Sequence, residues 1–167
     1  MDKRIGKFTY LLVVLLLLNA CVKPLQVVEE TPLAPLSWLV DTGEVIMLRA
    51  PLHVHDAKYH LVGYTADGER TSSYVNEILF PTDVIIVFKP GMSTPTVFLA
   101  RSPHGGCLLL WRPADLRFED PCFGSRFDLE GNYRSGPSPR DLDKLPATVR
   151  GNMLWVKGEI IYGKNHL

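Results

Sequence analysis

Short apolar runs separated by turn residues follow one another along most of the chain. Runs rich in β-branched and aromatic residues lie at 45–48, 59–64, 74–80, 84–88 and 96–100. Runs of this length and composition are typical of β-strands, and Asp67-Gly68, Pro90-Gly91 and residues 81–83 mark turns between them. No segment combines a 3.6-residue apolar period with the caps of an amphipathic helix. The pattern therefore predicts an all-β protein, an antiparallel sandwich or small barrel.

The first 20 residues differ from the rest of the chain. Lys3, Arg4 and Lys7 precede an apolar run at residues 11–18. This run is shorter than the roughly 20 apolar residues that a membrane-spanning helix needs, so we predict a secretory signal peptide. Residues 18–21, Leu-Asn-Ala-Cys, resemble the bacterial lipobox. That resemblance implies that residues 1–20 are a lipoprotein signal peptide and that Cys21 carries a covalent lipid. One alternative is an ordinary cleaved signal in which Cys21 has no role. The other, an uncleaved anchor, is disfavoured because Asn19 and the prolines at 24, 32 and 35 interrupt it.

The remaining chain is divided by composition into a tether and one domain. Prolines and a scarcity of aromatic residues over residues 21–37 predict an extended tether, and residues 38–163 are predicted to form the domain. Removing residues 1–20 takes away three basic residues and one acidic residue. The mature chain then has 15 basic and 17 acidic residues, a formal net charge of −2. This charge excludes the basic footprint of a nucleic-acid-binding protein.

Two motifs, at residues 102–107 and 120–125, carry the most specific information in the chain. They read Ser-Pro-His-Gly-Gly-Cys and Asp-Pro-Cys-Phe-Gly-Ser. They resemble the two cluster-binding boxes of Rieske [2Fe–2S] domains, C-x-H-x-G-C and C-P-C-H-G-S, in which two cysteines and two histidines ligate the two irons. In this resemblance Ser102 and Asp120 occupy the cysteine-ligand positions, and His104 and Phe123 occupy the histidine-ligand positions. Only His104 keeps the ligand type of the family.

The resemblance extends beyond the boxes and is strongest over residues 83–158. It includes the loop residues Gly106, Gly124 and Ser125, a later Gly136-Pro137 segment, and a final hairpin at residues 145–149 and 153–156. It implies a Rieske-like domain of the bc type, with a two-loop cluster-binding subdomain.

The same resemblance implies a disulfide between Cys107 and Cys122, whose equivalents join the two cluster loops in bc-type Rieske proteins. Of the three cysteines, Cys21 would carry lipid, so no thiol would remain in an oxidising compartment. The CxxC spacing of redox motifs is absent, which favours a structural pair over a catalytic one.

The ligand positions lead us to expect no cluster. The Phe123 ring has no lone pair, and Gly105 replaces the bulkier apolar residue that is usual in the family. We expect Phe123 to fill volume that the metal would occupy, and Asp120 and Ser125 to hydrogen-bond with loop N–H groups. Because a serine or aspartate oxygen can ligate iron, Ser102 and Asp120 do not exclude a cluster by themselves.

Two functions follow from this reading. The first is a cluster-free lipoprotein on the extracytoplasmic (periplasmic) side of a bacterial membrane. It would be a non-catalytic accessory or structural subunit of a respiratory or photosynthetic electron-transfer complex. Its partners would be the membrane, through the lipid, and protein subunits of that complex. The alternative is an electron-transfer protein with an atypically ligated [2Fe–2S] or other metal centre on Ser102, His104 and Asp120.

Other candidate chemistry is sparse. His53, His55 and His60 lie close in sequence, and the H-x-H pair suits a metal site, but an exposed polar strand edge is the favoured interpretation. Trp38, Trp111 and Trp155 are predicted to be core residues. No catalytic triad order or phosphate-binding glycine loop is present in the sequence.

Overall fold

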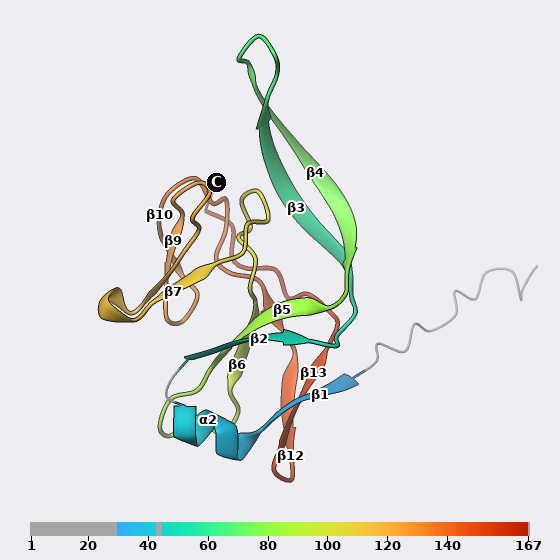
Figure 1. The fold of residues 1–167 in the computed structure, drawn as a ribbon, viewed down its shortest axis with the longest axis vertical. Coiled ribbons are helices and arrows are strands. Elements are labelled where there is room, and N and C mark those ends of the chain that lie inside the picture. The colour runs from blue at the N-terminus through green and yellow to red at the C-terminus, as the bar shows by residue number, and fades with distance from the viewer. Residues whose placement is uncertain (1–29, 43–44, 167) are drawn as a thin grey trace, which may run out of the picture.

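The structure, a computed structural model, describes residues 30–42 and 45–166. The predicted signal peptide at residues 1–20, Cys21 and the tether residues before 30 lie outside this part of the chain. Every strand pairing within it is antiparallel. The predicted antiparallel all-β fold is therefore confirmed (Figure 1).

The described strands form four sheets. One has three strands: β1 (Glu30–Pro35), β13 (Met153–Lys157) and β12 (Ala147–Arg150). A second has four: β11 (Lys144–Leu145), β6 (Thr96–Leu99), β5 (Thr82–Val87) and β2 (Val45–Ala50). A third has four: β10 (Tyr133–Ser135), β9 (Arg126–Asp128), β8 (Arg117–Glu119) and β7 (Leu110–Arg112). The fourth is the hairpin of β3 (Val54–Tyr64) and β4 (Arg70–Leu79).

The prediction of a tether is wrong for residues 30–37. Residues 30–35 form strand β1, which pairs with β13, and helix α2 (Leu36–Thr42) follows directly. β1 is at the edge of its sheet. Pro32 and Pro35 have no N–H group to donate to a neighbouring strand, and an edge strand tolerates this because it has only one neighbour. Ala34 and Leu39 are almost fully buried in the core. The folded domain thus includes residues before 38, and an antiparallel bridge between Arg140 and Asn165 extends it past 163.

The three tryptophans were predicted to be core residues, and this is wrong for Trp38, whose exposed fraction is 58%. Trp38 lies on α2, a single short helix with one side facing solvent (Figure 1). Trp111 and Trp155 are half-buried. Neither α2 nor the 3-10 helix η1 (Pro113–Asp115) is long and apolar enough to cross a membrane.

Two apolar clusters hold the sheets together. The first joins the β1–β13–β12 sheet, α2, the base of the β3–β4 hairpin and one face of β5 and β6. The second uses the opposite residues of β5 and β6, Ile85 and Phe98, and packs them against Phe118 and Phe127 of the β7–β10 sheet. Because side chains alternate along a strand, β5 and β6 contribute to both clusters and connect the two halves of the molecule.

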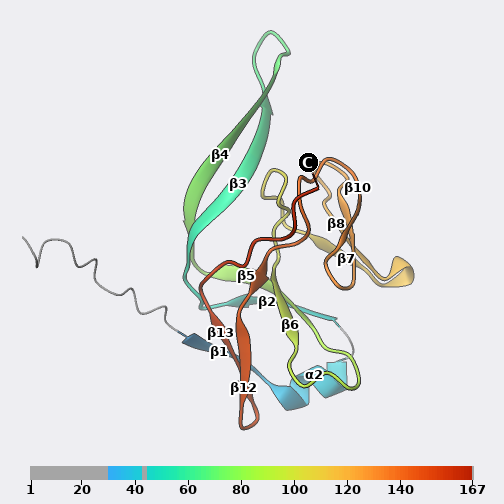
Figure 2. The ribbon, with the colours of Figure 1, turned by 180° about the vertical axis from the view of Figure 1, so that it is seen from behind.

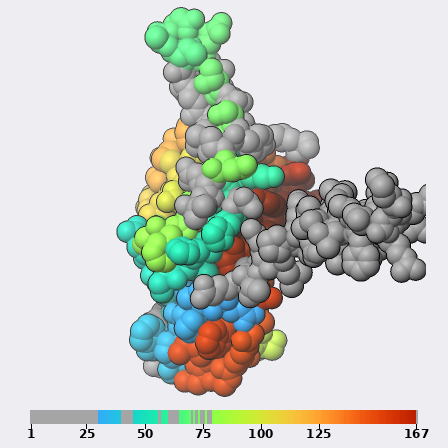
Figure 3. Space-filling view, turned by 90° about the vertical axis from the view of Figure 1, so that its right-hand side faces the viewer, coloured from blue at the N-terminus to red at the C-terminus, as the bar shows by residue number. Residues whose placement is uncertain are grey.

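The β3–β4 hairpin projects from the body beside the segments that connect β6 to β7 (Figures 1 and 2). Its tip stands clear of the rest of the molecule in the space-filling view (Figure 3). Val54, at its base, is fully buried, and Tyr59, midway along β3, is 2% exposed. The hairpin is therefore anchored at its base and free of the body at its tip.

Candidate functional site

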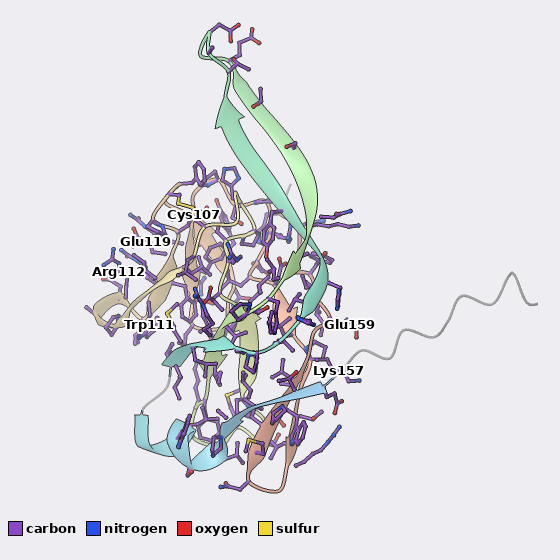
Figure 4. All side chains as sticks on the ribbon, turned by 45° about the vertical axis from the view of Figure 1, so that its right-hand side comes forward. Cys107, Trp111, Arg112, Glu119, Lys157 and Glu159 are labelled. Carbon is purple, nitrogen blue, oxygen red and sulfur yellow. A yellow bond between two sulfur atoms is a disulfide. The ribbon has the colours of Figure 1, made fainter. Side chains whose placement is uncertain are left out.

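Two loops contain the motifs that the sequence singled out. Loop 1, residues 102–107, follows β6, and loop 2, residues 120–125, connects β8 to β9. The predicted disulfide between Cys107 and Cys122 is confirmed and joins the loops with their Cα atoms 6.3 Å apart. Figure 4 labels Cys107, which lies beside the β3–β4 hairpin and above Trp111 and Arg112 of β7 in that view. The structure thus brings together two motifs that are well separated in sequence.

The two loops have the same backbone hydrogen-bond pattern. In loop 1 the Ser102 N–H donates to the Cys107 carbonyl at 2.8 Å and the Gly106 N–H donates to the Ser102 carbonyl at 3.0 Å. In loop 2 the Asp120 N–H donates to the Ser125 carbonyl at 2.8 Å and the Gly124 N–H to the Asp120 carbonyl at 2.8 Å. Gly106 and Gly124, which close the two turns, have φ of 69° and 78°, a conformation that favours glycine.

The residues at the cysteine-ligand positions cap these turns. The Asp120 Oδ1 atom accepts the N–H groups of Cys122 at 2.8 Å and Phe123 at 3.2 Å, which confirms the predicted capping. Ser102 Oγ accepts the His104 N–H at 3.2 Å. The expectation for Ser125 is wrong, because its buried Oγ has no hydrogen-bond partner among the described residues. The Ser125 hydroxyl is buried, and the N–H groups of Cys122 and Phe123 donate to Asp120 instead.

Phe123 lies over loop 1. Its ring meets the His104 ring edge-on, with centroids 5.0 Å apart and planes at 88°. A Cβ atom at Gly105 would overlap with the Phe123 ring. Gly105 and Phe123, two departures from the Rieske pattern, are therefore in contact with each other, and a side chain at 105 would require the Phe123 ring to move.

A third segment, which includes Gly136 and Pro137, supports loop 2. Gly136 has φ of 100°, and a Cβ atom there would lie 2.5 Å from the Ser125 Cα and 2.8 Å from the Gly124 carbonyl oxygen. The Tyr133 hydroxyl donates to the Gly136 carbonyl at 2.6 Å. Loop 2 thus rests directly on the backbone of this segment.

Gly136→Ala is expected to destabilise the fold more than Gly124→Ala does. Both glycines have positive φ, for which alanine costs about 1 kcal/mol. Gly124 has no atom within 4 Å of its added Cβ, whereas alanine at 136 must also displace backbone, at about 1–3 kcal/mol more. Urea unfolding of the two variants measures the difference. Equal losses would mean that the close approach of Gly136 to loop 2 has no energetic weight.

A buried ion pair, which no sequence motif indicated, fixes the segment after Pro137. The Arg140 Nε and Nη2 atoms donate to the two Asp143 oxygens at 2.8 and 2.7 Å. Arg140 also donates to the Lys58 carbonyl of β3 at 3.2 Å, and Asp143 accepts the Gly163 N–H at 3.0 Å. The pair therefore connects this segment to the β3–β4 hairpin and to the C-terminal residues.

The four ligand positions do not fit a conventional Rieske cluster. They supply one imidazole, from His104, the oxygen atoms of Ser102 and Asp120, and the Phe123 ring, which has no lone pair. The cluster needs two thiolates and two imidazoles. The ring also covers the side of His104 that it contacts, so a ligand approaching from that side would have to displace it.

The remaining histidines lie outside the two loops. His53 and His55 are exposed, as predicted, with ring centroids 6.0 Å apart, and His53 packs against Phe80. His60 is in β3, and its side chain is not described. The ring contacts of His53 are with His55 and Phe80, and neither of these residues belongs to loop 1 or loop 2.

Part of the chain is similar in sequence to known iron–sulfur subunits. Cytochrome b6-f complex iron-sulfur subunit 2 of Nostoc sp. is 32% identical over 72 residues, 43% of this chain and 40% of that protein. The cytochrome b6-f complex iron-sulfur subunit of Chlorobaculum thiosulfatiphilum is 35% identical over 75 residues, 45% of this chain and 41% of that protein. The matched segments thus span about two fifths of these relatives. No family model matches the chain.

Among solved structures, the plasma membrane Rieske protein PetC3 from Synechocystis aligns with a TM-score of 0.48 and 22% identity. The alignment covers 76% of this chain and 98% of that protein. A hyperthermophilic respiratory Complex III chain aligns with a TM-score of 0.40 and 19% identity, covering 90% of this chain and 93% of that chain.

Proposed function

We propose that this chain, which is related to Rieske iron–sulfur subunits over part of its length, is a cluster-free accessory subunit of a membrane-bound electron-transfer complex. One observation carries the proposal. At the four ligand positions a single family ligand, His104, remains, while Phe123 and Gly105 interlock where the two loops meet. A redox role would need the ligands. A structural role needs only the loops, which the disulfide and the turn hydrogen bonds hold.

The proposed role is non-catalytic and rests on a protein contact at the loop end, by which we mean loops 1 and 2 and the adjoining residues 108–110. Leu108, next to the disulfide, and Leu110, on β7, are 44% and 39% exposed. The fully buried core of a protein–protein interface is more apolar and poorer in charged residues than the rest of the surface, so two neighbouring exposed leucines suit the core of such a contact. The relatives are named as subunits of the cytochrome b6-f complex, so the proposed partners are protein subunits of a complex of that general class.

Anchoring on the periplasmic side of the membrane is the second part of the proposal. It rests on the signal-like residues 1–20 and on Cys21 at the lipobox position. A single lipid on Cys21 would place the folded domain, whose described part begins at residue 30, close to the membrane surface. A complex in the same membrane is then within reach of the loops.

Purification from native membranes tests both parts. The tagged chain is expected to fractionate with membranes and to bring down subunits of an electron-transfer complex, identified by mass spectrometry. Cys21→Ser, which cannot form the thioether, is expected to leave an unprocessed precursor without incorporated palmitate. Leu108→Glu with Leu110→Glu is expected to lose the subunits but keep the membrane fraction.

Met47→Glu is the matched control, because Met47 is an apolar side chain of similar exposure, 37%, on β2. Loss of the subunits in this variant as well would mean that the loop end is not the contact. Recovery of the wild-type chain without electron-transfer subunits would contradict the proposed role.

The alternative, an electron-transfer protein with an atypical centre, is favoured by one observation. The Asp120 Oδ2 atom, at one of the three ligand positions of that centre, is buried and has no hydrogen-bond partner among the described residues. Iron content distinguishes this alternative from the cluster-free subunit.

A further inference from the structure

Three potential metal ligands meet at the junction of the two loops, and only one of them is at a cluster-ligand position. The Cys107 and Cys122 sulfur atoms and an Asp120 carboxylate oxygen all lie within 4.8 Å of one another. In the structure the two sulfur atoms are bonded to each other. As a disulfide they cannot ligate a metal, because the thiolate is the ligand form of cysteine.

Asp120 places a buried carboxylate at this junction. The residue is 0% exposed. Its Oδ1 atom accepts two loop N–H groups, whereas Oδ2 is buried with no hydrogen-bond partner among the described residues. A buried carboxylate oxygen without a partner is costly, and a cation beside it would remove that cost. The two N–H bonds fix the carboxylate in place before any ligand arrives.

The disulfide is accessible to a reductant. Cys122 is exposed and Cys107 is half-buried, and exposed disulfides are more readily reduced than buried structural ones. An external dithiol can therefore break the bond. The protein gains two electrons and two protons and becomes a pair of thiols, while the external dithiol becomes a disulfide.

We propose that reduction turns this junction into a site for a thiophilic divalent cation such as Zn²⁺, ligated by Cys107 Sγ, Cys122 Sγ and an Asp120 carboxylate oxygen. Binding releases the two thiol protons. Zn–S bonds of about 2.3 Å and Zn–O bonds of about 2.0–2.2 Å place such ligands about 3.5 Å apart, so the sulfur atoms must separate by about 1–2 Å. The ion would then connect the two loops in place of the disulfide.

This inference is independent of the cluster-free proposal. It concerns the bridging cysteines in their reduced state, whereas the other concerns iron in the oxidised protein. Either can fail without the other.

The test uses the full chain, reduced with a phosphine, desalted without oxygen and titrated with Zn²⁺ against a chromogenic chelator. The reduced protein is expected to bind one more Zn²⁺ per chain than the oxidised protein. The oxidised protein is the reference because exposed histidines such as His53 and His55 are present in both states. Equal Zn²⁺ binding in the two states would overturn the proposal.

Asp120→Asn tests the third ligand. The amide oxygen can still accept the Cys122 and Phe123 N–H groups, while the charged oxygen is lost. Because removal of even an indirect partner of a metal commonly weakens binding about 10–100-fold, we expect at least about a tenfold increase in Kd. Asp115→Asn, which changes an exposed carboxylate on η1 that pairs with Arg117 of β8, is expected to leave Kd unchanged. An unchanged Kd in both variants would exclude Asp120 as a ligand and overturn the three-ligand site.

Co²⁺ gives a readout that does not depend on whether Asp120→Asn folds. The reduced wild-type protein with Co²⁺ is expected to show thiolate-to-metal charge-transfer absorption and the intense visible bands of a four-coordinate ion. Cys107→Ser with Cys122→Ser should lose both. A weak six-coordinate spectrum without thiolate bands in the wild type would overturn the site.

Discussion

Replacing both Cys107 and Cys122 by serine is expected to lower the free energy of unfolding by about 2–5 kcal/mol, the usual cost of losing a native disulfide from a small secreted domain. The bond closes a segment of 15 residues, for which loop-closure entropy alone gives about 3 kcal/mol. Each loop also has its own turn hydrogen bonds. We therefore expect the loops to separate while their individual turns persist.

Denaturant unfolding of the double variant, compared with oxidised and reduced wild-type protein, measures this cost. The reduced wild type is the matched control, because it lacks the bond but keeps both sulfur atoms. Protease cleavage between Arg101 and Arg126 is expected to rise before cleavage in the sheets. Two free thiols in the non-reduced wild-type protein, seen by mass spectrometry, would contradict a structural role for this pair.

Asp143→Asn is expected to cost about 3–5 kcal/mol, because it leaves the buried Arg140 guanidinium without its carboxylate partner. The side chains of Arg140 and Asp143 are only 7% and 2% exposed, and they meet in a two-point contact. Arg140 is also 5.1 Å from the centre of the Tyr162 ring. The variant should therefore weaken the attachment of the C-terminal residues as well as the overall fold.

Arg134→Ala is the control for this prediction. Arg134 pairs with Asp128 at 2.5 Å, but its side chain is 65% exposed, and exposed pairs contribute about 0–1 kcal/mol. Amide hydrogen exchange at Gly163, whose N–H donates to Asp143, is expected to accelerate in Asp143→Asn and not in Arg134→Ala. Equal effects of the two substitutions on unfolding would mean that burial adds nothing to the Arg140–Asp143 pair.

The local parts of the site could be predicted from the sequence, because short motifs encode them. The positions of both loops and the Cys107–Cys122 pairing followed from a resemblance to two six-residue boxes. The expectation that Asp120 accepts loop N–H groups followed from its place at a cluster-ligand position. It is confirmed by the Cys122 and Phe123 N–H groups, in keeping with the tendency of aspartate to accept N–H groups of nearby residues.

The long-range parts could not be predicted in this way. The interlocking of Phe123 with Gly105 depends on how the disulfide brings the loops together, which neither motif contains by itself. The Arg140–Asp143 pair looks like any charged surface pair in sequence, because charge patterns carry no information about burial. The sequence analysis did not predict strand β1, because it contains Pro32 and Pro35 and proline is rare in inner strands. An edge strand such as β1 tolerates proline.

The same limit explains the error at Ser125. A serine in a turn is commonly expected to bond to nearby N–H groups. Here Asp120 accepts the Cys122 and Phe123 N–H groups, and the buried Ser125 hydroxyl has no partner among the described residues. Which side chain meets a given N–H group depends on the folded geometry, which the sequence does not show.

The most direct test of the cluster-free proposal is the iron content of the oxidised protein together with its reduced-state EPR spectrum. The chain would be made in cells with intact iron–sulfur assembly, beside the Nostoc iron-sulfur subunit 2 as a positive control. We predict less than stoichiometric iron and no [2Fe–2S] signal, because Phe123 supplies no ligand atom and both cysteine ligands are replaced by oxygen donors. A [2Fe–2S] signal at one cluster per chain would contradict the cluster-free proposal.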